Sequence, residues 1–130
     1  MTDPLIDAYF KNRFSKSANL GLLKGANWTA DDRACRGGRD HLFLYLKIKD
    51  NAISDIKFQC GGCDQAMFVA GDILCDLIRG MNFDDIPKIP KERFSNILGG
   101  ESKEAVEHFG MAMKILEKGI QNISCKAREI

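Results

Sequence analysis

The stretch from His41 to Gln59, HLFLYLKIK-DN-AISDIKFQ, decides the fold of this chain. Its first half alternates between two sets of side chains, a period of two that predicts a half-buried β-strand: Leu42, Leu44, Leu46 and Ile48 on one face, and Phe43, Tyr45, Lys47 and Lys49 on the other. Asp50-Asn51 favours a tight turn. The alternation resumes over Ala52–Gln59, with Ile56 and Phe58 on one face. The pattern predicts a β-hairpin.

Beyond the hairpin the apolar period changes to about 3.6, which predicts a helix that ends near Gly80. Its apolar face comprises Ala66, Met67, Ala70, Ile73, Leu74, Leu77 and Ile78. Short helical pieces are expected at 83–86 and 91–98, around Pro87 and Pro90. After the break at Gly99-Gly100, a long closing helix should run from Glu101 to about Gln121.

The segment before the hairpin is less regular. Leu5–Phe14 has apolar residues at helical spacing and should form a short helix that docks on a sheet. Asn19–Thr29 is interrupted by Gly and Asn, as in a ragged strand or a loop, and Ala30–Arg39 has a loop composition. Strands followed by helices predict an α+β fold, a small antiparallel sheet of the hairpin and a third strand, covered by helices. The length favours a single domain over residues 1–130.

Composition excludes several classes of function. The net charge is +1, so no basic field points to nucleic acid. No apolar run is long enough for a membrane span, and the N-terminus does not resemble a secretory signal. Five cysteines in such a chain indicate reduced thiols in the cytoplasm, available for metal or sulfur chemistry.

The chemistry concentrates in Cys60-Gly61-Gly62-Cys63, between the second strand and the following helix. Two thiols at this spacing suit zinc, an iron–sulfur cluster or a redox disulfide. The helix start should favour the thiolate of Cys63. Hairpin pairing could also bring Cys35, in its glycine-flanked loop, near the two thiols, and Asp40 is a candidate oxygen ligand at the end of that loop.

From Tyr9 to Ile120 the chain resembles the U-type iron–sulfur cluster scaffolds (IscU, SufU and the N-terminal domain of NifU). Lys57-Phe58-Gln59-Cys60-Gly61-Gly62-Cys63 matches the family's Lys-Phe-x-x-x-Gly-Cys, so Cys63 corresponds to its second cluster cysteine. Cys35 and Asp40 match the family's Cys-Gly-Asp when 36–39 is an expanded loop. Leu98-Gly99-Gly100 and His108-Phe109 match its Leu-Gly-Gly and His-Cys.

The last match contains the main departure, because Phe109 stands where the family has its third cysteine. Cys60 is an extra cysteine and could supply the missing thiolate. The predicted ligand set is then Cys35, Cys60 and Cys63 with either Asp40 or His108. The proline-rich motif that binds a chaperone in some members is replaced by 103–107, which puts a chaperone interaction in doubt.

The resemblance implies a scaffold or carrier rather than an enzyme. It would take sulfur from a cysteine desulfurase, hold a labile 2Fe–2S cluster and pass it to recipient apo-proteins. One alternative is a divergent zinc- or iron-binding homologue that acts in sulfur transfer or its regulation. A second is a thiol–disulfide oxidoreductase using Cys60 and Cys63, although such dithiols usually lie in a βαβ context. Cys75, inside a helix, is expected to be a buried small hydrophobe.

Overall fold

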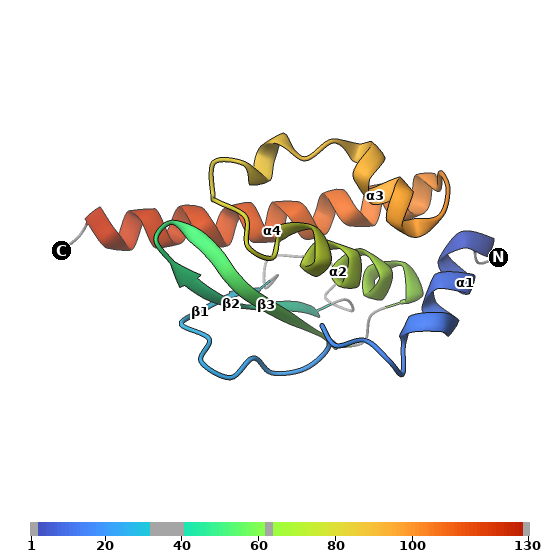
Figure 1. The fold of residues 1–130 in the computed structure, drawn as a ribbon, viewed down its shortest axis with the longest axis horizontal. Coiled ribbons are helices and arrows are strands. Elements are labelled where there is room, and N and C mark those ends of the chain that lie inside the picture. The colour runs from blue at the N-terminus through green and yellow to red at the C-terminus, as the bar shows by residue number, and fades with distance from the viewer. Residues whose placement is uncertain (1–2, 32–40, 62–63, 129–130) are drawn as a thin grey trace.

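The computed structural model describes residues 3–31, 41–61 and 64–128. For residues 31, 41 and 122–128 it describes the backbone alone. Four α-helices, one 3₁₀ turn and three strands follow one another along this part of the chain (Figure 1). In order they are α1 (Pro4–Arg13), β1 (Trp28–Asp31), β2 (His41–Lys49), β3 (Ala52–Gly61), α2 (Gln65–Ile78), η1 (Ile86–Lys88), α3 (Lys91–Leu98) and α4 (Lys103–Arg128).

The sheet is antiparallel with strand order β1-β2-β3, which confirms the predicted hairpin, the third strand and the α+β class. Leu44 lies opposite Phe58, and both are buried. The hairpin turns at Asp50 and Asn51, whose φ angles of 54° and 60° are those of a tight two-residue turn. β3 continues through Gly61, beyond the predicted end of the strand, so Cys60 belongs to the sheet.

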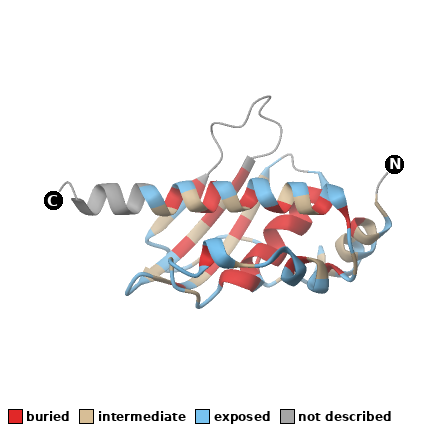
Figure 2. Ribbon diagram, turned by 90° about the horizontal axis from the view of Figure 1, so that it is seen from above, coloured by how far each residue is buried: buried red, intermediate tan, exposed pale blue. Residues whose placement is uncertain are grey.

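Helices α2 and α4 cover one face of the sheet, α2 against β3 and α4 against β1 (Figures 1 and 2). The hydrophobic core lies between these two layers. Two glycines permit the close approach. A Cβ atom at Gly71 would lie 2.9 Å from the ring of Phe58, and one at Gly119 would lie 2.6 Å from Cβ of Ala30. Both distances are too short for side-chain carbons.

The predicted apolar face of α2 is confirmed, since all seven of its residues are buried. Other side chains of α2 are buried as well, because the helix packs against β3, α1, α3 and α4. The expectation that α1 docks on the sheet is wrong: α1 packs mainly on α2 and α3, since α2 and α4 already cover that sheet face. Phe14 follows the end of α1 and its side chain is 51% exposed.

The remaining elements follow the sequence more closely. α3 has the predicted bounds, and Gly99 ends it with φ of 99°. α4 begins two residues later than expected and continues well past Gln121, to Arg128. Within the described ranges, no helix is both long and apolar enough to cross a membrane.

Candidate functional site

Cys60 lies near the end of β3, two residues after buried Phe58, so its side chain faces the helices. α2 begins a few residues later, and Asp64 caps it, with Oδ1 accepting a hydrogen bond from the Met67 N–H at 2.9 Å. Together with His108 of α4, described below, Cys60, Asp64 and Gln65 form what we call the Cys60 corner. The corner therefore joins the end of the sheet to the start of α2.

Cys60, Asp64 and Gln65 line a cavity of about 760 Å³. Its other walls are mostly apolar and come from α1, the segment after it and α2: Ile6, Phe10, Phe14, Leu20, Ala66 and Phe68, with Glu104 of α4. Phe10, Phe14 and Phe68 contact one another, with ring centroids 4.8 to 5.4 Å apart. The cavity thus has an aromatic wall facing a polar, sulfur-containing one.

Gln65 contributes an unusual atom to this cavity. Its Oε1 is buried and has no hydrogen-bond partner within the described part of the chain. Buried polar atoms are nearly always paired, so an unpaired one calls for an explanation such as a water or an ion.

His108 projects from α4 toward the start of α2. Its Nδ1 lies 2.8 Å from the backbone oxygen of Glu104, and its Nε2 lies 3.7 Å from Oδ2 of Asp64. The His108 side chain is only 17% exposed. The predicted ligand His108 therefore lies at the Cys60 corner, beside a carboxylate that sequence reasoning did not select.

Cys35, Asp40 and Cys63 lie outside the described residues. The described ends of their segments can be placed. His41 pairs with Gly61, next to Cys60, and Asp31 pairs with Phe43, so the connection between β1 and β2 leaves and re-enters the sheet at the end that carries Cys60. Among the described side chains, no group of three His, Cys, Asp or Glu residues is close enough to hold a metal ion.

The two cysteines with described side chains differ in chemistry. Cys60 is disulfide-bonded, which requires a second cysteine sulfur beside it. Cys75 is a free thiol, completely buried in α2, and burial raises the pKa of its thiol well above the usual value. Cys75 is therefore the predicted packing residue.

Phe109, which stands where the family has its third cysteine, packs against helix α3. Its ring is buried against Phe94 of α3, with centroids 4.5 Å apart. The aromatic side chain fills the core between α3 and α4, while the adjacent His108 faces Asp64.

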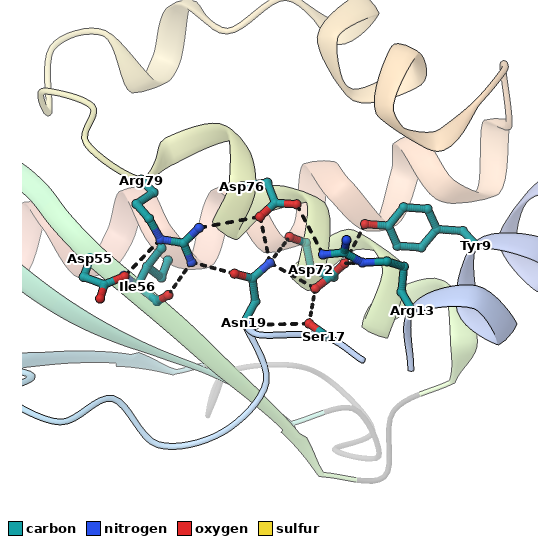
Figure 3. Close-up of polar contacts among 9 residues, drawn as sticks. All are labelled: Tyr9, Arg13, Ser17, Asn19, Asp55, Ile56, Asp72, Asp76 and Arg79. Carbon is teal, nitrogen blue, oxygen red and sulfur yellow. Dashed lines mark hydrogen bonds and ion pairs between the residues drawn. The ribbon is translucent and has the colours of Figure 1, made fainter. Parts of the chain in front are cut away.

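Sequence reasoning missed a second polar region, which lies on α2 and which we call the Asp72 network (Figure 3). Its members are Tyr9, Arg13, Ser17, Asn19, Asp55, Asp72, Asp76 and Arg79. Asp72 is completely buried. Its Oδ2 accepts from the Tyr9 hydroxyl at 2.5 Å and from Arg13 Nε at 3.3 Å, and its Oδ1 accepts from Ser17 Oγ and from Asn19 Nδ2 at 3.0 Å.

The network ties the N-terminal segment to α2 and to the edge of β3. Asn19 donates to Asp76 at 2.9 Å and accepts from Arg79 at 2.5 Å, while its backbone pairs with Phe58. Arg79 also donates to Asp55 and to the backbone oxygen of Ile56, both at 2.9 Å. The available signal was a lone Asp72 within an otherwise apolar stretch of helix, which implies a buried, paired carboxylate.

Residues 7–129 match the NifU-like N terminal domain. The chain belongs to this family. Over 111 residues it is 28% identical to the iron–sulfur cluster assembly scaffold protein IscU 1 of Archaeoglobus fulgidus, a match that covers 84% of this chain and 70% of that protein. It is also 29% identical over 114 residues to the nitrogen fixation protein NifU of Azotobacter chroococcum, covering 86% of this chain and 36% of NifU.

The family also accounts for the fold. The crystal structure of a nitrogen-fixing NifU-like protein (N-terminal) from Brucella abortus superposes with a TM-score of 0.67 over 95% of this chain and 94% of that one. The two sequences are 14% identical, so this likeness concerns the fold alone. The resemblance inferred from the sequence motifs is confirmed.

Proposed function

We propose that this NifU-like domain is a scaffold on which an iron–sulfur cluster is assembled and from which it is transferred. Sulfur would come from a cysteine desulfurase, and the 2Fe–2S cluster would pass to apo-proteins. The chain would act over residues 1–130 as one domain, as a carrier rather than an enzyme, in the cytoplasm, where thiols stay reduced. Relatives named as scaffolds support this role.

The observation that carries the proposal is the position of Cys60. It lies on β3 beside the start of α2, in a cavity that also contains Asp64 and that Phe14 borders. Asp64 and Phe14 are both more than half exposed, so a cluster bound here could be reached by another protein. Thiolates are the usual ligands of iron–sulfur clusters. Cys35 and Cys63 would complete the thiolate set with Cys60, and Asp40 or His108 would be the fourth ligand.

Cluster reconstitution tests this proposal. Protein reduced and purified without oxygen, then supplied with iron and sulfide, should turn brown and contain iron and acid-labile sulfide in equal amounts. Cys60→Ser should abolish or strongly reduce this uptake. Cys75→Ser is the matched control, because Cys75 is buried in the core, and should keep full uptake per folded chain. A colourless wild-type protein holding one zinc ion and no sulfide would favour the zinc-binding alternative.

A thiol–disulfide oxidoreductase is the second candidate, and the disulfide at Cys60 is the observation that favours it. Its dithiol would be oxidised as a substrate disulfide is reduced to two thiols, and an external thiol reductant would then restore it. Turnover of insulin disulfides that disappears in Cys60→Ser would support this function. The same disulfide must be reduced before Cys60 can bind a cluster, so both assays start from reduced protein.

A further inference from the structure

We propose that residues 3–17, which comprise α1 and the turn after it, open as a unit while the sheet, α2, α3 and α4 stay folded. We call this segment the N-terminal strap. Its opening removes one wall of the cavity that Cys60 lines. The opening is a property of the fold, and only its use, to admit a partner protein to Cys60, rests on the proposed function.

The strap supplies much of the apolar wall of this cavity. Ile6, Phe10 and Phe14 all line it. The rings of Phe10 and Phe14 pack on Phe68 of α2, with centroids 5.2 and 5.4 Å from that of Phe68. Phe68 and Cys60 belong to α2 and β3, which stay in place when the strap leaves. Opening therefore uncovers an aromatic ring and widens the cavity beside Cys60.

The strap has a weak apolar attachment. Of the ten residues of α1, Ile6 alone is buried. Leu5, Tyr9 and Phe10 are only partly buried, and Phe14 is 51% exposed. α2, by contrast, is buried along nearly its whole length. Because the burial of apolar surface is the main force that holds an element in the fold, α1 needs less free energy to detach than α2 does.

Polar contacts with α2 fix the closed position of the strap (Figure 3). In α1, the Tyr9 hydroxyl and Arg13 Nε donate to Asp72 Oδ2 at 2.5 and 3.3 Å. Arg13 Nη2 also lies 3.6 Å from Asp76 Oδ2. At the end of the strap, the Ser17 hydroxyl donates to Asp72 Oδ1. One buried carboxylate thus holds both the helix and the turn that follows it.

A single hydrogen bond holds the start of the strap to α4, with Ser102 Oγ donating to Asp3 Oδ2 at 2.7 Å. When the strap opens, water replaces the lost partner of each polar group, so every such bond adds only a modest net free energy to the closed state. Polar contacts therefore select one closed position and still leave the opening reversible.

The chain is fixed again directly after the strap. The Asn19 backbone oxygen accepts the Phe58 N–H, and the Gly21 N–H donates to the Phe58 oxygen, both at 2.8 Å. The Asn19 side chain donates to Asp72 Oδ1 at 3.0 Å. The hinge therefore lies just before Asn19. Asp72 keeps this amide as a donor when the strap leaves, and water takes the place of the Tyr9 hydroxyl.

Amide hydrogen exchange of the reduced full chain, followed at several urea concentrations, tests the inference. After correction for intrinsic rates, the slowest amides of α1 should exchange at least about tenfold faster than the slowest amides of α2, since they open locally. Their exchange should also depend little on urea, because a local opening exposes little surface, whereas exchange in α2 should accelerate steeply.

Two conservative variants separate strap opening from global unfolding. Tyr9→Phe removes a contact that opening breaks, and should raise exchange in α1 about fivefold, the effect of one hydrogen bond. Ile53→Val is the control. Ile53 is buried near the start of β3, far along that strand from Cys60, and its contacts survive strap opening. This variant should raise exchange in α2 severalfold and leave α1 at the wild-type rate.

Three results would overturn the inference: equal exchange rates and urea dependence in α1 and α2, an equal effect of Ile53→Val on both helices, or wild-type exchange of α1 in Tyr9→Phe. Failure of the proposed function looks different. A chain whose α1 opens locally but that takes up no iron and sulfide would refute the scaffold role and keep the strap. Cluster uptake by a chain whose α1 exchanges only through global unfolding would keep the scaffold role alone.

Discussion

Two polar regions lie at helix α2, each containing an aspartate, and they differ in structure. In the Asp72 network, around the middle of the helix, both oxygens of a fully buried carboxylate accept hydrogen bonds from four side chains. At the Cys60 corner, at the start of the helix, Asp64 is more than half exposed, and Gln65 Oε1 has no partner among the described residues.

The difference separates polar groups that support the fold from those available to a ligand. A buried polar group with all its hydrogen bonds made helps to specify one structure and has no lone pair left for a ligand. A group held by one atom, with the other open toward a cavity, can bind an ion without loss of structure. Changes in the Asp72 network should therefore alter stability, and changes at the Cys60 corner should alter metal binding.

Asp72→Ala should have the largest effect on stability. It removes the acceptor of Tyr9, Ser17 and Asn19 and leaves Arg13 without its closest partner, a loss of about 3 kcal/mol or more in the free energy of unfolding. Urea unfolding measures this loss. Asp76→Asn alters a carboxylate of the same network that is 35% exposed, and should cost less than about 1 kcal/mol.

Metal affinity tests whether the Asp72 network takes part in metal binding at the Cys60 corner. The folded fraction of Asp72→Ala should bind Co²⁺ as the wild type does. A large loss of affinity with little loss of stability would show that the Asp72 network belongs to the site, contrary to the comparison.

Phe109→Cys should have the next largest effect. Removing the ring that packs against Phe94 creates a void in the core, with a cost of about 2–4 kcal/mol measured by urea unfolding. Because position 109 points toward α3, the new thiol should not increase the metal content per folded chain. Phe109→Leu is the control for volume, and a gain of bound metal in Phe109→Cys alone would contradict this geometry.

Substitutions of the two glycines of α4, Gly110 and Gly119, should change the free energy of unfolding by smaller amounts and in opposite directions. Gly119→Ala places a Cβ atom 2.6 Å from Cβ of Ala30, so the overpacking should lower the free energy of unfolding by about 1–3 kcal/mol. Gly110→Ala meets nothing within 4 Å and should raise it by up to about 1 kcal/mol through better helix propensity. Equal effects of the two changes in thermal unfolding would disprove the close packing of α4 on β1.

Tyr9→Phe should give the smallest effect, with a distinctive pH dependence. Burial, and then the hydrogen bond to Asp72, raise the pKa of Tyr9 above its usual value of 10. The folded state thus favours the neutral phenol, so the contribution of Tyr9 to stability is complete below pH 10 and decreases above it, as the unfolded chain ionises.

Near neutral pH, Tyr9→Phe should lower the free energy of unfolding by about 1 kcal/mol. Above pH 10 the difference from the wild type should narrow. Urea unfolding of both proteins from pH 8 to pH 11 measures it, and a constant difference over that range would show that the Tyr9 hydroxyl is not held by Asp72.

The sequence predicted those features that repeat locally. The hairpin at 41–59 and α3 at 91–98 were predicted because alternation and punctuation by Gly and Pro act over a few residues. The family motifs likewise pointed to the NifU-like domain. The position of α1 was predicted wrongly, since what a short apolar helix docks against depends on which surface the rest of the chain has left uncovered.

Some residues of the candidate site were likewise predicted from the sequence, and others were not. Cys60 and Cys63 were selected from residue type and spacing, and His108 from the family's His-Cys motif; the structure brings His108 next to Asp64, which lines the same cavity as Cys60. Asp64 was not selected, because a single Asp before a helix is an ordinary cap. Its second contact, with a side chain on α4, exists only in the folded chain.

The chain by itself determined its α+β class, its family and the cysteines that could carry the chemistry, because periodicity and motif spacing are written in neighbouring residues. Only the tertiary structure decided that Asp72 is fully paired, that Phe109 is core, and that Asp64 faces His108. Each of these depends on contacts between residues far apart in the sequence, which become neighbours only when the helices pack on the sheet.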